Sequence, residues 1–318
     1  DYQRKNRNFP HFSGHSKQYG LCGSYCLRHR SDALIMEYEN PHIPEGTNIT
    51  PVHPLKEFAW LFAGLVALIL ITILSLSYLA GALAQHIPYA WEARLLDKSI
   101  NKLVESRDRP DHERIERYLQ GLADELAVRQ ALPQDMKVKI HYFDGPMVNA
   151  FASLGGHIMI FRGALENVPN ENALAMVIAH EIAHIKHRDP IVAYSRAITV
   201  GMALSNLVGA DPGGSIGQLA GTTSALTQLS FTRQQESAAD KEALRTLQDY
   251  YGHTLWSDSF FQYVVERKQG KYPPKFLSSH PNPEARIEQA LTFRTEHPAT
   301  SPAMATALPE FVLALKQR

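Results

Sequence analysis

Two histidines four residues apart, with a glutamate directly after the first, are the residues best suited to chemistry in this sequence. His180, Glu181 and His184 lie within one short run, Ala-His-Glu-Ile-Ala-His. Side chains four residues apart share one face of a helix, so both imidazoles can reach a single metal ion. Glu181 is turned by about 100° from His180 and can hold a water molecule on that metal. The spacing therefore predicts a catalytic zinc site with an activated water.

A chance occurrence of this pattern is the alternative, because the chain has 15 histidines. The neighbours argue against chance, since they are small or aliphatic, as in a buried helix: Ala175, Val177, Ile178, Ala179, Ile182 and Ala183. A charged glutamate is costly to bury in such surroundings unless a metal or a polar group compensates it. The composition of the segment therefore favours the metal site.

One metal ligand is missing from this motif, because a catalytic zinc takes three protein ligands. A third histidine six residues after the second would stand where the chain has Pro190, so that ligand pattern is excluded. Glu236 and Asp240 stand four residues apart, separated by Ser, Ala and Ala. Two such acids often form a solvated helix face, but the small residues between them indicate close packing. We expect Glu236 to bind the metal and Asp240 to support a histidine.

Charge and composition exclude several classes of protein. Lys+Arg and Asp+Glu balance at 32 each, which removes the electrostatic case for a nucleic-acid-binding protein. Apolar residues make up 44% of the chain, enough for a sizeable core. The two cysteines, Cys22 and Cys26, are too few for a fold held by several disulfides.

One segment has the composition of a membrane span. No Asp, Glu, Lys or Arg occurs within Phe58–Trp91. As a helix, Phe58–Ala84 would reach roughly 40 Å, which exceeds the roughly 30 Å of a hydrocarbon core. Trp60 at one end and Tyr89 at the other stand where interfacial aromatic residues are expected. We therefore predict a transmembrane helix over residues 58–84; a buried core helix and a cleaved signal peptide are the alternatives.

Residues 1–57 are expected to be a disordered tail, of which residues 1–35 are not expected to belong to the natural protein. The first methionine is Met36, and the preceding segment shows no strand or helix periodicity. The alternative is a second zinc site, built from His11, His15, Cys22, Cys26 and His29. Residues 297–318 are expected to form a C-terminal tail.

The elements that must position the candidate site follow the apolar helix. Amphipathic patterns predict these helices: Leu95–Ser106, His112–Gln130, Asn170–His187, Gln234–Tyr250, Asp258–Lys268 and Pro309–Lys316. Strands are predicted over Lys137–Phe143 and after the turn Gly155-Gly156, over His157–Phe161. Pro190 is expected to end the motif helix. The fold class expected is α+β: a mainly helical domain with a small sheet, preceded by one transmembrane helix.

The apolar stretch Ile191–Leu229 is the other candidate for a membrane span, but its sequence argues against one. Arg196 and the Gly-Ala-Asp-Pro-Gly-Gly sequence at 209–214 divide it into pieces too short to cross a bilayer. We expect helices packed around or over the active site.

Several segments together resemble the HtpX and CAAX-prenyl-protease family of gluzincin metallopeptidases, in its branch with a single span. The matching segments are Val148–Arg162, the His-Glu-Ile-Ala-His helix, Glu236–Asp240, Ser279-His280-Pro281 and Arg286. They occur in the family's order, and the resemblance implies a mainly helical zinc-peptidase (gluzincin) domain over residues 92–296. Because members that process prenylated proteins carry several spans, prenyl substrates are not expected here.

The resemblance implies roles for individual residues. It implies Glu236 as the third zinc ligand, Asp240 as the partner of a histidine and His280 near the scissile carbonyl. It also implies that the strand Gly156–Phe161 is a sheet edge that binds extended substrate, with these substrate-binding residues: Asn149, Ala150, Phe151, Gly156 and His157. Arg286 is expected to pair with Asp240 or with substrate, and the sequence leaves both open.

The function expected is that of a membrane-anchored zinc metalloendopeptidase with one Zn²⁺ per chain, in which Glu181 takes the proton of the activated water. The expected partners are protein or peptide substrates, including misfolded envelope proteins, and membrane lipid; no nucleic acid is expected. A catalytically silent scaffold for binding or chaperoning, and a hydrolase of non-peptide bonds, are the alternatives.

The expected location is a bacterial inner membrane with the catalytic domain in the periplasm, as the family branch implies. The distribution of positive charge favours the opposite orientation. Near the span the N-terminal side has only Lys56, whereas the other side has Arg94, Lys98 and Lys102.

Overall fold

The computed structural model describes residues 39, 53–94, 110–209, 230–270, 274–300 and 303–317. The chain divides into two compact units, Asp1–Pro54 and Leu55–Arg318, and the elements below lie in the second, apart from Pro54 itself. Several expectations fall outside the described residues: nearly all of the N-terminal tail with its alternative zinc site, the helix Leu95–Ser106, and residues 210–229 of the second apolar stretch.

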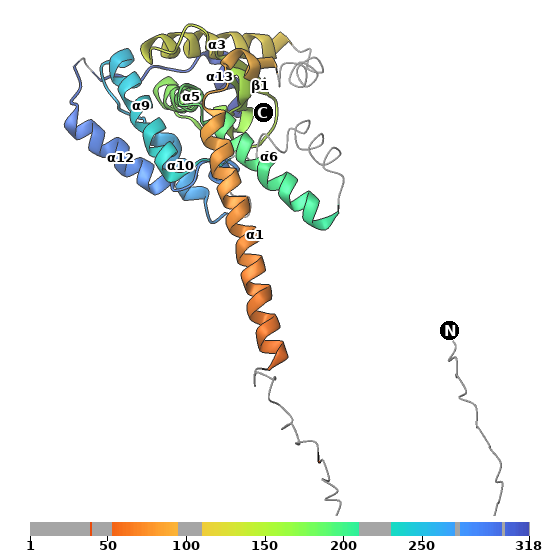
Figure 1. The fold of residues 1–318 in the computed structure, drawn as a ribbon. Helices are drawn as coiled ribbons and strands as arrows, with labels where there is room; N and C mark the ends of the chain where they lie inside the picture. The colour runs from red at the N-terminus through yellow and green to blue at the C-terminus, as the bar shows by residue number, and fades with distance from the viewer. Residues whose placement is uncertain are drawn as a thin grey trace, which may run out of the picture. The chain divides into compact units, whose positions relative to one another are not determined.

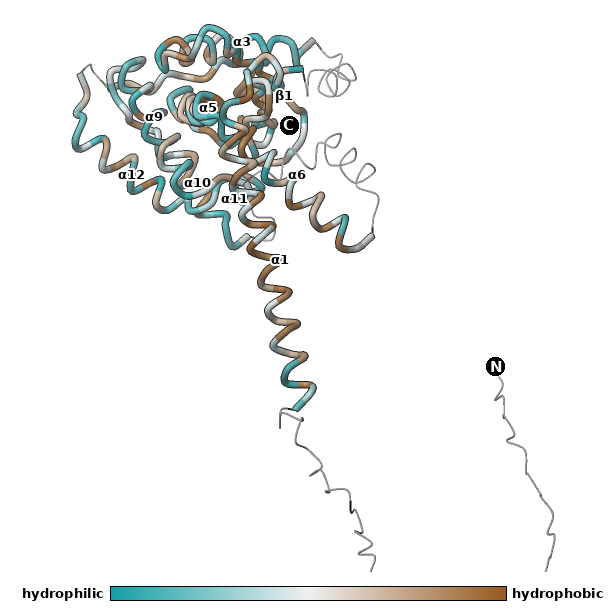
Figure 2. Tube along the Cα trace, in the orientation of Figure 1, coloured by the Kyte–Doolittle hydropathy of each residue, from teal (hydrophilic) through white to brown (hydrophobic). Residues whose placement is uncertain are grey.

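The first helix, α1 (Pro54–Ala84), is long and apolar enough to cross a membrane. Its large side chains are exposed along most of its length, among them Trp60 and Leu74, and Figure 2 shows a nearly continuous apolar segment. This exposure argues against the alternative of a buried core helix. The last turns are covered by the domain, since Ser77, Gly81 and Ala84 are buried.

A three-stranded sheet follows, with the strands in the order β1-β3-β2. The strands are β1 (Lys139–Phe143), β2 (Ala150–Ala152) and β3 (His157–Phe161), with a short 3-10 turn, η1 (Leu154–Gly156), between the last two. β3 pairs with β1 in parallel and with β2 in antiparallel orientation. The expectation that Gly156–Phe161 forms the sheet edge is therefore wrong. β3 is hydrogen-bonded on both sides, and the short strand β2 is the edge beside it.

The motif helix, α5 (Glu171–Lys186), passes through the middle of the domain, packed against β2 and against the two helices α3 (Pro110–Arg129) and α9 (Arg233–Tyr251) (Figure 1). The predicted cap of α5 is confirmed, because Asn170 Oδ1 accepts from the backbone N–H of Ala173. Apolar side chains cover every side of α5. A helix buried on all sides can hold polar groups only if they are mutually satisfied.

Pro190 was expected to end the motif helix, but it lies in the first turn of the next helix. α5 ends at Lys186, and Arg188 then takes a left-handed conformation with φ 65°. The next helix, α6 (Asp189–Val208), has Pro190 in its first turn, where the missing N–H is not needed. The proline thus opens a new helix instead of ending the old one.

The remaining helices complete the core around α5. They are α4 (Arg162–Asn167), α10 (Ser259–Arg267), α11 (Phe276–Ser279), α12 (Pro283–Glu296), α13 (Glu310–Leu313) and the 3-10 turn η2 (Ala314–Gln317). The end of the chain is not the separate tail expected for residues 297–318. Leu308, Val312 and Leu315 are buried in the main core. The domain therefore extends to its last described residues.

Candidate metal centre and active site

Two helices bring three candidate ligands together at the centre of the domain. His180 and His184 of α5 are fully buried, and their Nε2 atoms lie 2.9 Å apart. Glu236, in the first turn of α9, places Oε2 3.5 Å from Nε2 of His180 and Oε1 3.5 Å from Nε2 of His184. A capping box between Thr232 and Gln235 fixes the start of α9 directly before this glutamate.

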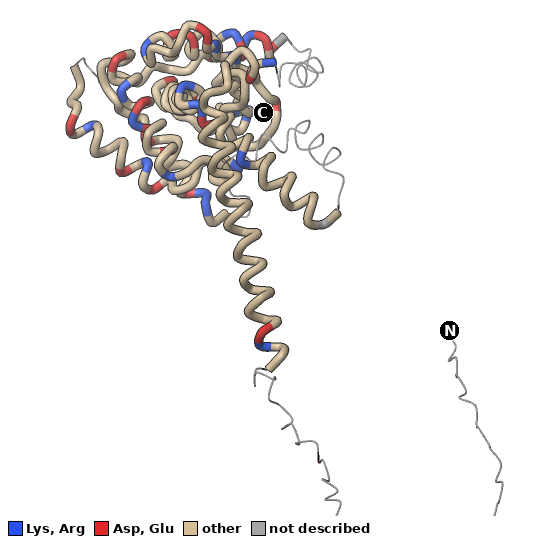
Figure 3. Tube along the Cα trace, in the orientation of Figure 1, with Lys and Arg blue, Asp and Glu red and all other residues tan. Residues whose placement is uncertain are grey.

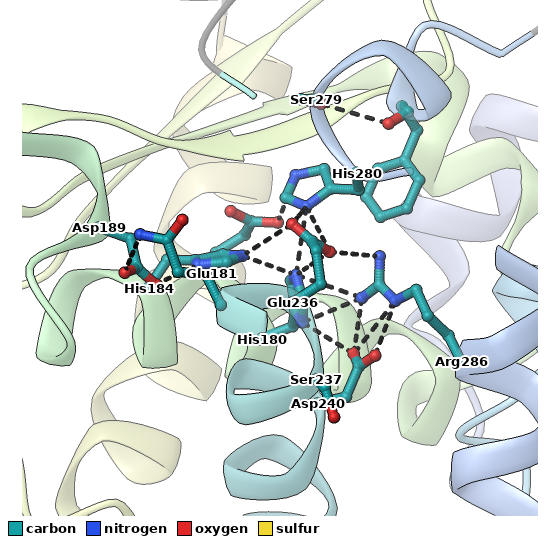
Figure 4. A network of polar contacts seen from close by, with 12 residues as sticks. His180, Glu181, His184, Asp189, Glu236, Ser237, Asp240, Ser279, His280 and Arg286 are labelled. Carbon is teal, nitrogen blue, oxygen red and sulfur yellow. Dashed lines mark hydrogen bonds and ion pairs between the residues drawn. The ribbon is translucent and has the colours of Figure 1, made fainter. Parts of the chain in front are cut away.

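His280 joins this cluster from the end of α11 (Figure 4). Its Nδ1 lies 3.0 Å from Oε1 of Glu236, and its Nε2 lies 3.5 Å from Oε1 of Glu181. The ring stacks on Phe276 with 4.4 Å between centroids. Burial lowers the pKa of His280, and the carboxylates of Glu236 and Glu181 oppose this shift.

The donor set fits a zinc ion. Ligand atoms of His180, His184, Glu236 and His280 all lie within 4.8 Å of one another. Zinc binds imidazole nitrogen and carboxylate oxygen at roughly 2.0–2.2 Å, so atoms that share one ion lie roughly 3–4 Å apart. Burial alone would raise the pKa of Glu236, but His280 and the two other histidines hold this pKa well below its usual range. An ionised carboxylate is the form that binds a metal.

A carboxylate contacts Nδ1 of each motif histidine, on the side of the ring away from Nε2. Nδ1 of His180 lies 2.9 Å from Asp240, as the sequence predicts. Nδ1 of His184 lies 2.8 Å from Asp189, which in turn accepts from the amide of Gln235 at 2.5 Å. Such partners fix the tautomer and direct the Nε2 lone pair toward a metal. Sequence reasoning missed Asp189, and the only signal was an acidic residue five positions after His184.

Arg286 of α12 lies behind Asp240 and Glu236. Its guanidinium donates to both carboxylate oxygens of Asp240, at 2.9 Å and 2.7 Å, and Nη1 lies 3.3 Å from Glu236. The pair is buried. Burial would raise the pKa of Asp240, but Arg286 and then His180 hold this pKa below its usual value. Of the two partners that the sequence left open, the structure pairs Arg286 with Asp240.

Glu181 lies between the cluster and the sheet edge. Its Oε2 accepts from the backbone N–H of Ala152 at 2.7 Å, while Oε1 has no hydrogen-bond partner among the described residues. Backbone groups at odd-numbered positions of this segment bond to β3: Asn149 O accepts from the N–H of Phe161, and the N–H of Ser153 donates to the carbonyl of His157. The backbone of Ala152 therefore faces away from the sheet, toward the candidate metal centre.

The five predicted substrate-binding residues lie in two different places in the structure. Asn149, Ala150 and Phe151 lie on or next to the edge strand β2. Gly156 and His157 lie toward β1: Gly156 packs against Tyr89 and the carbonyl of Lys137, and Nδ1 of His157 is 2.8 Å from His141. The first three thus lie on or next to the strand that contacts Glu181, whereas Gly156 and His157 lie at the start of β3 and contact residues of β1 and the segment before it.

A buried ion pair connects the chain after α1 to the loop between α5 and α6. Glu92 Oε2 lies 2.7 Å from Nη1 of Arg188, and Glu92 Oε1 accepts from the N–H of Gly155. Arg188 also donates to the carbonyl of Ile87. Because Asp189 is the next residue, this contact holds the loop that positions His184.

Comparison with known proteins gives a family match over the same part of the chain. The model of peptidase family M48 matches residues 113–294. The beta-barrel assembly-enhancing protease of Escherichia coli (strain K12) is 30% identical over 167 residues, which is 49% of this chain and 34% of that protein. The putative beta-barrel assembly-enhancing protease of Vibrio cholerae is 28% identical over 193 residues, 57% of this chain and 39% of that protein.

A mitochondrial protein also matches. The mitochondrial metalloendopeptidase OMA1 of Schizosaccharomyces pombe is 30% identical over 164 residues, 49% of this chain and 46% of that protein. The chain thus spans less than half the length of each of these three relatives.

Proposed function

This chain belongs to peptidase family M48, and from that premise we propose that it is a zinc-dependent endopeptidase whose ligands are His180, His184 and Glu236. The observation that carries the proposal is the convergence of these three side chains beside Glu181 and an edge strand. An edge strand can bind an extended polypeptide by adding it to the sheet. A hydrolase of non-peptide bonds would not need this arrangement.

Zinc, when bound, would act as a Lewis acid that lowers the pKa of a water molecule and polarises a carbonyl group. Glu181 is placed to take the proton of the attacking water through Oε1, which accepts no hydrogen bond among the described residues. The same carboxyl group then passes that proton to the leaving amine. Asp240 and Asp189 keep the two imidazoles in the tautomer that leaves Nε2 free.

His280 is proposed to stabilise the oxyanion of the reaction. The Glu236 carboxylate can only accept, so Nδ1 of His280 carries a proton, and Nε2 donates only when the ring is protonated. Negative charge that develops beside the ring favours the protonated form. The position of Nε2 next to Glu181 supports contact with the reacting atoms.

For the biological role we propose protein quality control in a bacterial envelope, with α1 as a membrane anchor and the catalytic domain in the periplasm. The names of the relatives support this proposal, since they are assembly-enhancing proteases and a mitochondrial metalloendopeptidase. The length and exposure of α1 support the anchor. Misfolded envelope proteins are the substrates that we propose.

Two variants of the full-length protein test the assignment. Glu181→Gln should fold, retain one zinc per chain and lose cleavage of casein, because it removes the base and no ligand. Glu236→Ala should lose zinc. Metal analysis and a casein assay measure both outcomes. Full zinc in Glu236→Ala would remove Glu236 from the ligand set, and activity in Glu181→Gln would show that the protein does not use this base.

A further inference from the structure

The outer half of α6 carries an apolar surface that the candidate active site does not use. Met202, Leu204 and Leu207 are 42%, 54% and 58% exposed. No Asp, Glu, Lys or Arg occurs from Ala197 to Ala210, and Figure 3 shows the outer part of α6 without a charged residue. A helix end that faces water usually carries charge on its exposed side, so this composition is typical of a surface in contact with an apolar partner.

α6 begins beside the point where α1 leaves the domain. Ala84 belongs to the same buried cluster as Ile191, and Gly81 lies against Val192 and Arg196. α1 enters the domain with its C-terminal end, and α6 leaves the domain from its N-terminal end. The two helices therefore run in roughly opposite directions, and the outer half of α6 points back toward the side from which the apolar helix comes (Figure 1). Figure 1 draws both helices on the same side of the domain.

Length places this outer half at the depth of a bilayer. A hydrocarbon core of about 30 Å takes roughly 20 residues of a helix. If the part of α1 inside the hydrocarbon core begins after Lys56 and Glu57, it ends near Ser77, where α1 enters the domain. From Ala197 to the end of α6, the helix extends roughly 18 Å. That length carries the exposed apolar side chains of α6 to the level of the apolar part of α1.

Two polar side chains on this part of α6 make hydrogen bonds within the helix. Thr199 Oγ1 and Asn206 Nδ2 each donate to the backbone carbonyl four residues earlier, at 2.8 Å. Thr72 of α1 makes the same bond at 2.8 Å. This arrangement removes the need for water at these groups, as an apolar surrounding requires.

We propose that the outer half of α6 lies in the membrane interface, with Met202, Leu204 and Leu207 in contact with the acyl chains of the bilayer that α1 spans. The inference rests on the membrane anchor in the proposed function. Because α6 starts at Asp189, which contacts His184, this arrangement holds the active site close to the membrane surface. Its substrates would be polypeptides that are presented there.

The test uses the full-length chain in vesicles of phosphatidylcholine and phosphatidylglycerol. Cys22 and Cys26 are replaced by serine, and single cysteines labelled with NBD are introduced as Leu204→Cys or Leu207→Cys. Leu65→Cys in α1 reports the anchor, and Val128→Cys, 75% exposed on α3, is the matched control. Doxyl-labelled phosphatidylcholine quenches NBD that contacts acyl chains. Cleavage of casein by each labelled protein reports catalytic function separately.

We expect strong quenching at positions 65, 204 and 207 and none at position 128. Quenching at 65 without quenching at 204 or 207 would overturn the inference and leave the anchor intact. No quenching at any of the three positions would overturn both. Equal quenching at 128 would also overturn it, because contact with lipid would then not be confined to this surface. Loss of casein cleavage with the expected quenching would reject the proposed catalysis alone.

Discussion

At the scale of residues, the candidate site is a series of charged contacts that runs from the core to the metal ligands. Arg286 pairs with Asp240, Asp240 with His180, and Arg286 also approaches Glu236. Each carboxylate is buried, so its ionised form depends on the cation beside it. Arg286 therefore contacts one proposed ligand, Glu236, directly and another, His180, through the carboxylate of Asp240.

Replacing Arg286 should be costly. Arg286→Met keeps most of the side-chain volume but leaves the buried carboxylate of Asp240 without its cation and removes the guanidinium next to Glu236, which should lower the free energy of unfolding by about 3–5 kcal/mol. Lys268→Met is the matched control, because it breaks an ion pair with Glu284 whose two side chains are about half exposed. That change should cost at most about 1 kcal/mol. Urea unfolding of both variants in detergent measures the difference, and equal stabilities would contradict the role given to Arg286.

His280→Ala distinguishes two consequences of its position. If the ring stabilises the oxyanion, kcat should fall by about 10²–10³-fold with zinc retained. Zinc affinity, from competition with a chelator, is the second measurement. A fall in affinity with little change in kcat at saturating zinc would show that His280 instead orients Glu236, which its Nδ1 contacts. An unchanged rate and affinity would remove His280 from the site.

The sequence could predict which residues lie together as candidate ligands, because their spacing is local. His180 and His184 are linked by the helical repeat, and Glu236 and Asp240 by the same repeat on a second helix. The partner of His184 could not be predicted in this way. Asp189 reaches its histidine only because Arg188 takes a left-handed conformation and reverses the chain, and no spacing rule predicts such a turn for arginine.

At the scale of elements, the 3-10 turn η1 joins the edge strand β2, which contacts Glu181, to the central strand β3. Gly156 has φ 76°, and a Cβ there would lie 2.0 Å from both the carbonyl of Lys137 and the hydroxyl of Tyr89. The hydroxyl of Tyr89 donates to that same carbonyl at 2.8 Å. The turn is thus closed against the segment that follows α1 and against the start of β1.

Gly156→Ala should therefore destabilise the domain. The left-handed backbone alone costs an alanine about 1–3 kcal/mol, and the two close contacts add to this. Gly121→Ala on α3 is the control, because its Cβ would meet open space; it should be neutral or stabilise the helix by up to about 1 kcal/mol. Thermal unfolding of the two variants measures the contrast. A Gly156→Ala protein as stable as Gly121→Ala would show that the turn can rearrange.

The order of the strands in the sheet could not be predicted from the sequence. The sequence predicted strands over Lys137–Phe143 and His157–Phe161, and the structure has them at Lys139–Phe143 and His157–Phe161. Both faces of β3 are buried, so alternation does not reveal its neighbours. The very short β2 has no recognisable strand pattern. Which strand forms the edge depends on pairing between distant segments, and hydrophobic alternation does not encode it.

At the scale of the whole molecule, the end of the chain supports the beginning of the motif helix. The carbonyl of Thr306 accepts from the N–H of Glu171, and its N–H donates to Asn172. Lys316 donates to the carbonyl of Val168. The composition of residues 297–318, rich in proline, alanine and threonine, gave no indication of these contacts, because they are made largely by the backbone.

A chain that ends at residue 302 should fail to fold stably. It would lose Leu308, Val312 and Leu315 from the core, at about 1.5–3 kcal/mol each and thus about 5–9 kcal/mol together. That sum is comparable to the about 5–15 kcal/mol that stabilises a typical domain. Limited proteolysis would measure the loss. Met304→Ala, 75% exposed, is the control and should change nothing. A protease-resistant truncated protein would mean that the C-terminal contacts are dispensable.

The contact between Glu92 and Arg188 has a consequence for the evolution of this chain. Arg188 combines a left-handed backbone, which glycine would adopt more easily, with a buried cation that glycine cannot supply. Loss of either charge alone leaves the other unpaired in the interior, a change that selection should remove. Among relatives in which α1 is retained, positions 92 and 188 should therefore keep or lose their charges together. Where both are lost, position 188 becomes free to accept glycine.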